Sequence, residues 1–448
     1  MKKVLFPLVL LSFSGANAQS WVPQATNLAL NAGVDEIAIV DPNTVWITAY
    51  DGSGSGAYLH AYSRTSDGGN TWTAGSIAGT GMISTAVVGD IAAVDANTAW
   101  VVTAPTSGTA GNGIWKTTNG GTTWTLQTSP YNTSSFADVI YFWDANNGFS
   151  AGDPVGGNFQ ILKTSNGGTT WTAVSGTPAS LGSSDGAYTG IKKVVGDNIW
   201  LGTTMGRILH STDRGLTWSA YFSPVLDFGG IITPNSFGHF AFKDANNGLL
   251  IAVDNSTDAV MYSTTDGGAN WDPIDPTGTW FFGDIAYVPG TSNTYVSSGI
   301  DSTAAQGVGS SYSTDGGNTW TIIDNDDATT GGQRGRLNFL SQSTGWCGFF
   351  SDGNPGTTGI FKFDGSLGVA DVNAVKSNLK VYPNPAVDIV NIKADKDIKS
   401  VTLYDTSGKK VKSYTGSEIN VSSLTKGTYM LQVYYGNGAV ENTKLIKK

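Results

Sequence analysis

One eight-residue pattern occurs six times along the chain, and it constrains the fold more than any other feature. The pattern is Ser/Thr-x-Asp/Asn-x-Gly-x-Thr/Asn-Trp, and its tryptophans are 52, 47, 47, 53 and 49 residues apart. The copies occupy residues 65–72, 117–124, 164–171, 211–218, 264–271 and 313–320. A period of about fifty residues indicates one supersecondary unit repeated along an array or around a ring.

The residue types of this pattern are typical of a tight hairpin turn. The Asp or Asn accepts backbone hydrogen bonds within the turn, the glycine common to all six copies supplies a positive φ, and the Trp begins the next strand. We therefore expect a structural role for Asp67, Asn119, Asn166, Asp213, Asp266 and Asp315, and for Trp72, Trp124, Trp171, Trp218, Trp271 and Trp320.

A second repeated turn completes the unit. It is DPNTVW at residues 41–46, and related segments occur at 95–100, 144–149, 197–200 and 244–249. Four antiparallel strands in about fifty residues make one blade of a β-propeller. Residues 336–364 supply three further strands, and residues 20–23 supply a fourth. The sequence therefore predicts an all-β chain with a seven-bladed propeller whose last blade is closed by the N-terminal strand.

The composition favours strands over helices. Only three Glu occur among 448 residues, against 59 Gly, 14 Trp, 17 Tyr and 18 Phe. Helical proteins depend on Glu, Lys, Leu and Ala, whereas aromatic residues suit strands and Gly suits turns.

The eight-residue pattern resembles the Asp-box, or BNR, repeat. Proteins with this repeat include sialidases, sortilin-type receptor domains, certain glucanases and photosystem assembly factors. The resemblance covers roughly residues 20–365 and implies the propeller fold. It implies little about function, because in the enzymatic members the repeat lies on the face opposite the active site.

The last part of the chain resembles the C-terminal sorting domain of the type IX secretion system of Bacteroidota. The residues that carry this resemblance are Tyr382, Pro383, Asn384, Pro385, Gly408, Lys409, Gly427 and Tyr429. Short alternating strands in the same stretch predict a small Ig-like β-sandwich. The resemblance implies recognition by the secretion translocon and its sortase, and a protein that is secreted or anchored at the outer-membrane surface.

The chain begins with the features of a secretory signal. Lys2 and Lys3 precede an apolar run, and Ala16-Asn17-Ala18 forms a small-residue cleavage site. We expect a signal peptide at 1–18, the propeller at 19–365, a linker at 366–376 and the sorting domain at 377–448. No later segment approaches 18 apolar residues, so we expect no transmembrane segment.

Charge and cysteine content exclude some classes of partner and linkage. Residues 19–370 carry 11 Lys and Arg against 28 Asp and Glu, a net charge of −17, whereas residues 371–448 carry 12 Lys against 7 acids, a net charge of +5. A body this acidic is unsuited to nucleic acid. Cys347 stands alone, so no intrachain disulfide forms. We expect a monomer.

The first strand of each blade supplies the candidate site. These strands surround the channel of a propeller, so the residue before the first buried apolar position is expected at the channel mouth. The candidates are Glu36, Asp90, Asp138, His239, Asp284 and Arg336, with Gly190 in the fourth blade and Trp280 as an exposed aromatic nearby. Two interpretations stay open: a binding site, or strand caps that hydrogen-bond the neighbouring blades. Trp280 is equally a ligand platform or a loop-packing residue.

We expect no cofactor, with one candidate for structural Ca²⁺. Asp324, Asp326 and Asp327 offer oxygen ligands in one loop, although they lack EF-hand spacing and also fit a solvated acidic loop.

Two functions remain. The first is a secreted or surface binding module that holds a glycan, peptide or protein at the channel mouth. The second is an extracellular glycoside hydrolase with its acid and base among Asp90, Asp138 and Asp284, which requires two carboxyls about 5–10 Å apart. We do not expect sialidase activity, because the sialidases that this repeat resembles need an Arg-Ile-Pro segment and a Tyr/Glu pair, whereas this sequence has no Arg-Ile-Pro and Glu36 is the only Glu in the propeller.

Overall fold

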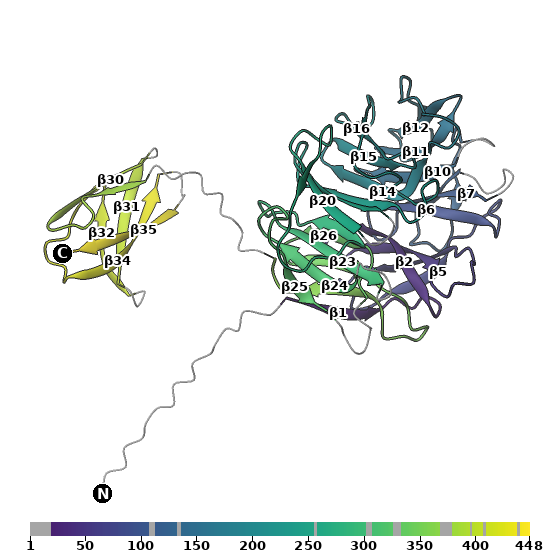
Figure 1. The fold of residues 1–448 in the computed structure, drawn as a ribbon. Coiled ribbons are helices and arrows are strands. Elements are labelled where there is room, and N and C mark those ends of the chain that lie inside the picture. The colour runs from purple at the N-terminus through teal and green to yellow at the C-terminus, as the bar shows by residue number, and fades with distance from the viewer. Residues whose placement is uncertain are drawn as a thin grey trace, which may run out of the picture. The chain divides into compact units, whose positions relative to one another are not determined.

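The computed structural model describes residues 19–448 except 107–112, 132–135, 255–257, 302–306, 326–332, 368–378, 395–396, 406–408 and 437–439. The chain divides into two compact units, residues 1–370 and residues 371–448. The described residues form strands and turns without a helix (Figure 1).

Six sheets of the larger unit each consist of four consecutive strands in antiparallel order. The first two are β2 (Ala32–Ile39), β3 (Val45–Asp51), β4 (Ala61–Thr65) and β5 (Thr73–Ser76), then β6 (Ala86–Ala93), β7 (Ala99–Pro105), β8 (Gly113–Thr117) and β9 (Thr125–Leu126). The third and fourth are β10 (Ala137–Phe142), β11 (Gly148–Val155), β12 (Asn158–Thr164) and β13 (Thr172–Ala173), then β14 (Ala187–Val195), β15 (Asn198–Thr203), β16 (Arg207–Ser211) and β17 (Ser219–Phe222). The fifth and sixth are β18 (Phe237–Phe242), β19 (Gly248–Asp254), β20 (Asp258–Thr264) and β21 (Asp272–Ile274), then β22 (Asp284–Tyr287), β23 (Tyr295–Asp301), β24 (Gly307–Ser313) and β25 (Thr321–Asp324).

The seventh sheet joins the two ends of the propeller. It contains β26 (Leu337–Ser341), β27 (Thr344–Gly348) and β28 (Gly359–Asp364), and its fourth strand is β1 (Ser20–Ala25). β1 pairs with β28 along its whole length, from Ser20 opposite Asp364 to Ala25 opposite Gly359. The buried Trp21 indole also donates a 2.8 Å hydrogen bond to Ser310 Oγ in the sixth blade. The predicted closure of the last blade by the N-terminal strand is therefore confirmed.

The first strands of successive sheets lie side by side and form a closed ring. β2 contacts β6, and the contacts continue through β10, β14, β18, β22 and β26 back to β2. Aromatic residues fill the space between sheets: Trp100 stacks on Phe142 at a centroid distance of 3.6 Å, and Trp200 stacks on Phe242 at 3.9 Å. The predicted seven-bladed propeller is confirmed.

The eight-residue repeats form the turns between the third and fourth strands. In the first copy, Asp67 accepts hydrogen bonds from the Thr71 amide at 2.9 Å and the Thr71 hydroxyl at 2.6 Å, and the Gly69 amide donates to Thr65 Oγ1 at 2.9 Å. Both glycines of the turn have positive φ, 71° for Gly68 and 87° for Gly69. The fourth copy has Arg214 at the first of these positions, with a φ of 59° that is uncommon for a residue with a side chain.

The smaller unit consists of two sheets with a buried core between them. β29 (Lys380–Tyr382), β30 (Ile389–Lys393) and β33 (Glu418–Asn420) form one sheet. The other contains β31 (Ile398–Tyr404), β32 (Lys410–Thr415), β34 (Gly427–Tyr435) and β35 (Val440–Lys447). Val390, Leu403 and Leu431 are among its fully buried residues. This arrangement fits the predicted Ig-like β-sandwich.

Candidate functional site

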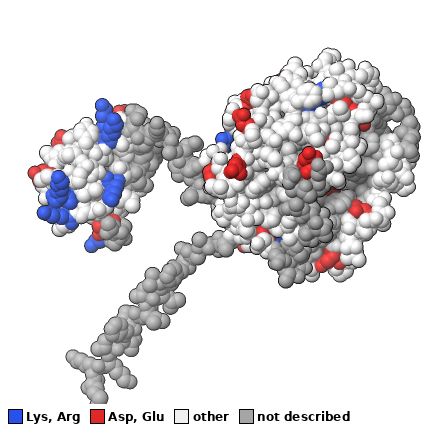
Figure 2. Space-filling view, in the orientation of Figure 1, with Lys and Arg blue, Asp and Glu red and all other residues white. Residues whose placement is uncertain are grey.

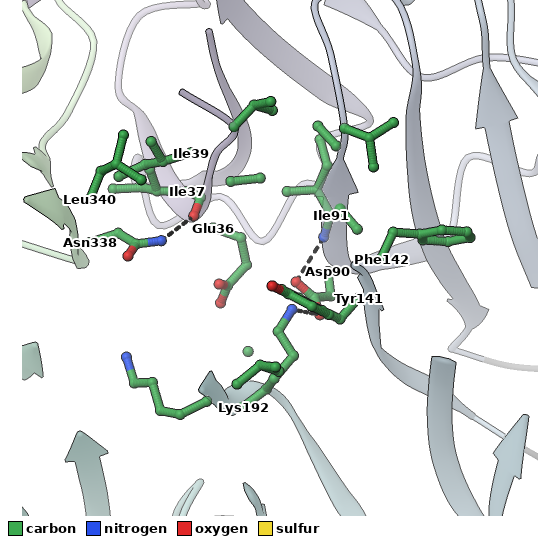
Figure 3. A pocket seen from close by; sticks show the side chains of 18 of the residues that line it. Glu36, Ile37, Ile39, Asp90, Ile91, Tyr141, Phe142, Lys192, Asn338 and Leu340 are labelled. Carbon is green, nitrogen blue, oxygen red and sulfur yellow. Dashed lines mark hydrogen bonds and ion pairs between the residues drawn. The ribbon is translucent and has the colours of Figure 1, made fainter. Parts of the chain in front are cut away.

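A cavity of about 700 Å³ lies among the first strands of the propeller blades (Figure 3). Its wall includes residues 36–40 of the first blade, 90–95 of the second, 141–145 of the third and 336–340 of the seventh, together with Lys192, Lys193 and Asp284. It extends along these strands to exposed turn residues such as Asp95 and Asp144. Those turns are bonded to the eight-residue repeats, for example through the Gly120 amide and the Asn97 carbonyl, so the cavity reaches the repeat-bearing face.

The strand registers correct two members of the predicted column. Ala38 pairs with Trp46, Ala92 with Trp100, Tyr141 with Phe149 and Lys193 with Trp200. The residues two positions earlier are Glu36, Asp90, Val139 and Ile191, so Asp138 and Gly190 are one residue out of the column. The first strands of all four blades carry a β-bulge, and Asp138 is the bulged residue of β10, directly before the column position. Gly190 still lines the channel cavity. Asp138 lines a different cavity.

Asp90 and Asp284 join neighbouring blades. The two oxygens of Asp90 accept hydrogen bonds from the amides of Ile91 and of Ile140 in the next blade, both at 2.8 Å. Asp284 repeats this arrangement with the amides of Ile285 and Leu337. Both side chains are almost completely buried. The strand-cap interpretation therefore holds for these two residues.

Glu36 differs from the two aspartates, because its carboxyl points into the cavity (Figure 3). Its Oε1 atom has no hydrogen-bond partner and lies 3.5 Å from the guanidinium of Arg336. Burial raises the pKa of Glu36 to about 8, although Arg336 opposes this shift. At neutral pH the group is therefore mostly a neutral acid, whose O–H can donate a hydrogen bond.

Two lysines complete the wall, and the sequence analysis missed both of them. Lys192 forms an ion pair with Asp90 and donates to the Ile140 carbonyl at 2.8 Å. Lys193 lines the same cavity and makes no hydrogen bond or ion pair with any residue that the structure describes. Lysines in a predicted strand usually face solvent, and only the strand register places these beside the channel.

His239 lines a smaller neighbouring cavity with Lys193, Asp284 and Arg336. Its Nδ1 atom lies 3.6 Å from Asp284 Oδ1, and burial lowers the pKa of the imidazole to about 4. The imidazole is thus neutral at pH 7. Burial opposes ionisation of Asp284, but Lys193, His239 and Arg336 together lower the pKa of that carboxyl.

Trp280 packs against the blade rather than standing free. It is half-buried, its ring centroid lies 6.2 Å from that of Phe282, and it is absent from the wall of the channel cavity. Of the two interpretations, the structure favours loop packing.

The calcium candidate is only partly described. The Asp324 carboxylate forms an ion pair with Arg334 and accepts a hydrogen bond from Ser310. Asp326 and Asp327 lie outside the described residues. Among the residues that the structure describes, no group of three His, Cys, Asp or Glu side chains could hold a metal ion.

The predicted sorting residues divide between surface and core. Tyr382, Pro383, Asn384 and Pro385 are exposed, and Asn384 exchanges hydrogen bonds with the backbone of Lys444 and Ile446 in the last strand. Tyr429 is buried, and its hydroxyl donates a hydrogen bond to the Thr425 carbonyl. Lys409 and Gly427 are exposed, and Gly408 lies outside the described residues. Figure 2 shows basic side chains gathered on this unit, in contrast to scattered acidic ones on the propeller.

Comparison with known proteins identifies the smaller unit. Residues 380–448 match the family model described as a secretion system C-terminal sorting domain. The chain carries a type IX sorting domain. This domain indicates export to the cell surface or the extracellular space and implies interaction with the type IX secretion machinery. No helix among the described residues has the length and hydropathy needed to span a membrane.

The propeller is similar in fold to several solved structures. YCF48 bound to D1 peptide is 17% identical over 78% of this chain and 97% of its own, with a TM-score of 0.51. YCF48 from Cyanidioschyzon merolae is 16% identical over 78% of this chain and 99% of its own, with a TM-score of 0.54. The GH74 xyloglucanase from Xanthomonas campestris is 11% identical over 95% of this chain and 74% of its own, with a TM-score of 0.50. A search of the curated proteins finds no match to this chain.

Proposed function

We propose that this exported propeller is a binding module, and that its central cavity holds a carboxylate group of an extracellular ligand. The observation that carries the proposal is a set of unused hydrogen-bond donors in one open cavity. Lys193 makes no hydrogen bond or ion pair with a described residue, although its charge acts on Asp284, and Glu36 is mostly protonated at neutral pH. The hydroxyl of Tyr141 makes no hydrogen bond with a described residue (Figure 3).

A wall of hydrogen-bond donors favours a ligand group that accepts hydrogen bonds, and the positive charge of Lys193 favours an anionic group. A carboxylate presents two acceptor oxygens and forms charge-assisted hydrogen bonds, which are stronger than neutral ones. Lys192 pairs with Asp90, and Arg336 donates one hydrogen bond to the Asp35 carbonyl at 3.2 Å and lies 3.5 Å from Glu36. Lys193 makes no such contact with a described residue, and we expect specificity to arise from it.

The hydrolase alternative has less support in this cavity. Hydrolysis needs two carboxyls free to face the substrate from either side of the scissile bond. Asp90 and Asp284 instead use both oxygens on backbone amides, and Asp138 lines another cavity. A peptide-bound structure exists for the similar propeller of YCF48, but at 17% identity the likeness concerns the fold, so the cavity residues carry the argument.

The test is a binding titration with probes that carry carboxylates on different backbones. Isothermal calorimetry of the mature full-length chain would use oligogalacturonate and an Asp/Glu-rich peptide, with neutral xyloglucan oligosaccharides for comparison. We expect one of the carboxylate probes to bind and Lys193→Gln to weaken its affinity about tenfold, which corresponds to losing one charge-assisted hydrogen bond.

Lys393→Gln is the matched control. Lys393 is exposed on the sorting domain, so this variant changes the net charge equally without altering the cavity. Equal weakening by both lysine variants, or a preference for the neutral probes, would contradict a carboxylate site in the channel.

A further inference from the structure

A second cavity, of about 780 Å³, lies between the third and fourth blades. Its wall comes from β10 and β11, from the segment between β13 and β14, and from the turn after β15. Within a blade, these segments connect the second strand to the third, or they lead from the fourth strand to the first strand of the next blade. The eight-residue repeats connect the third strand to the fourth, so the two sets of connections lie at opposite ends of the strands. This cavity is therefore separate from the channel cavity, which reaches the repeat-bearing face.

Asp138 is the first unusual group in this wall. It sits in the bulge of β10, is only 2% exposed, and its Oδ2 atom has no hydrogen-bond partner. Burial, reinforced by the charge of Asp153, raises the pKa of Asp138 well above its usual range. This environment favours the neutral form of the carboxyl, which carries an O–H donor.

Asp153 is the second group, and it keeps a charge at neutral pH. Burial raises its pKa to about 6, while a hydrogen bond from the Ala187 amide favours the ionised form. The backbone of Gly186 passes so close that a Cβ atom there would lie 2.3 Å from Asp153 Oδ1. The wall therefore holds a fixed acceptor beside the donor of Asp138.

The remaining lining argues against a metal ion or an anion. Asp185 is already neutralised by an ion pair with Arg207 and accepts a hydrogen bond from the Leu181 amide at 2.8 Å. No three carboxylates among the described residues converge as metal ligands do. The ionised Asp153 carboxylate in the wall would repel an anion.

The rest of the wall is polar but uncharged, with an apolar edge. Small hydroxyl and glycine residues predominate, and Tyr188 and the exposed Ile231 supply apolar surface. Neighbouring donors and acceptors beside an apolar surface complement a ring with many hydroxyl groups, because each hydroxyl both donates and accepts.

We infer that this cavity is a binding site for a neutral saccharide, with Asp138 donating to one hydroxyl and Asp153 accepting from another. The site is independent of the proposed channel function. It gives the exported protein two ligand sites of different chemistry, one on each face of the propeller.

The experiment is a calorimetric titration of the mature full-length chain at pH 7 with cellohexaose, xyloglucan heptasaccharide and mannohexaose. We expect at least one of these probes to bind. Asp138→Leu keeps the size of the side chain but removes the donor, and should weaken that affinity at least tenfold. Gly186→Ala should do the same by displacing the Asp153 carboxylate, and it preserves Asp138 if the first variant fails to fold.

Lys193→Gln should leave the saccharide affinity unchanged, because Lys193 belongs to the channel cavity. The variant therefore distinguishes a failure of the saccharide inference from a failure of the channel proposal. The inference is overturned if none of the three saccharides binds, or if folded Asp138→Leu and Gly186→Ala bind as the parent does. It is also overturned if CaCl₂ alone raises the melting temperature of the parent and not of Asp138→Leu, which would indicate a cation site.

Discussion

Carboxyl groups at matching positions of different blades do different work in this protein. Asp90 and Asp284 are short enough to reach the amides of the next blade, and they act as clamps between sheets. Glu36 occupies the same register but has one more methylene, and its carboxyl points into the channel instead. One methylene therefore separates a structural residue from a candidate binding residue.

The clamp predicts that Asp284→Asn destabilises the fold. An amide replaces one acceptor oxygen with a donor, which would face either the Ile285 or the Leu337 N–H. Leaving one buried amide unpaired costs about 1–3 kcal/mol. Urea denaturation should show this loss, whereas Asp275→Asn, at an exposed position, should stay within about 0.5 kcal/mol of the parent. Equal stability of the parent and Asp284→Asn would show that the clamp is dispensable.

Glu36 predicts a pH dependence of binding. The charged and titratable groups around it are Asp35, Asp90, Lys192 and Arg336, and burial still raises its pKa to about 8. Above that pH the donor becomes an anion, so a carboxylate ligand should bind more weakly. At pH 9 about one molecule in ten keeps the proton, so affinity should fall about tenfold from its low-pH limit. Calorimetry with the carboxylate probe that binds at pH 7 would measure this.

Glu36→Gln is the control for this dependence. Glutamine keeps a donor at every pH, so the variant should bind nearly equally at pH 7 and pH 9. Titration of Glu36 also changes the stability of the fold with pH, in the direction opposite to that of a carboxylate held in an ion pair. Its pKa in the fold is above the ordinary value of 4.5, so its contribution to stability declines as pH rises from about 4.5 to 8. A variant that keeps the full pH dependence of binding would assign the effect to another group.

At the scale of elements, the ring depends on one short N-terminal strand. β1 pairs along six residues with β28 and buries Trp21 against Phe339 and Phe363. Deleting residues 19–26 should expose an open sheet edge and cost several kcal/mol, since burial of a large aromatic side chain alone contributes about 3–5 kcal/mol. Thermal melting and light scattering should show a lower melting temperature and association.

Trp21→Phe is a less disruptive variant than this deletion, because it keeps the strand and removes only the indole and its hydrogen bond to Ser310. We expect a smaller decrease in melting temperature and no association. Unchanged melting of the deletion variant would mean that closure of the ring depends on other contacts.

The blades were predictable from the sequence because each is a local unit with its own turn chemistry. The repeated Asp or Asn and Gly dictate the hairpins, so the strands and even the closing Trp21 follow from spacing. The site was less predictable, because it depends on bulges and on which blades face one another. Asp138 occupies the bulge of β10 and lines another cavity, whereas the register of β14 places Lys192 and Lys193 at the channel.

At the scale of the whole molecule, the two units have separate tasks. The propeller offers cavities, and the sorting domain presents Tyr382, Pro383 and Asn384 at its surface. Deleting residues 377–448 should leave a folded propeller in the periplasm, because the export signal is lost while the core of the propeller is intact. Cell fractionation with immunoblotting would measure this, and normal appearance of the truncated chain at the surface or in the medium would contradict it.

The central claim is that the channel cavity of this exported propeller binds a carboxylate through Lys193. The most direct test is a crystal structure of the mature chain soaked with the carboxylate probe that binds most tightly in solution. We predict difference density for a carboxylate within hydrogen-bond distance of Lys193 Nζ and the Glu36 carboxyl, and none in crystals of Lys193→Gln. Density for the probe outside the channel, with the cavity still filled by water, would contradict the claim.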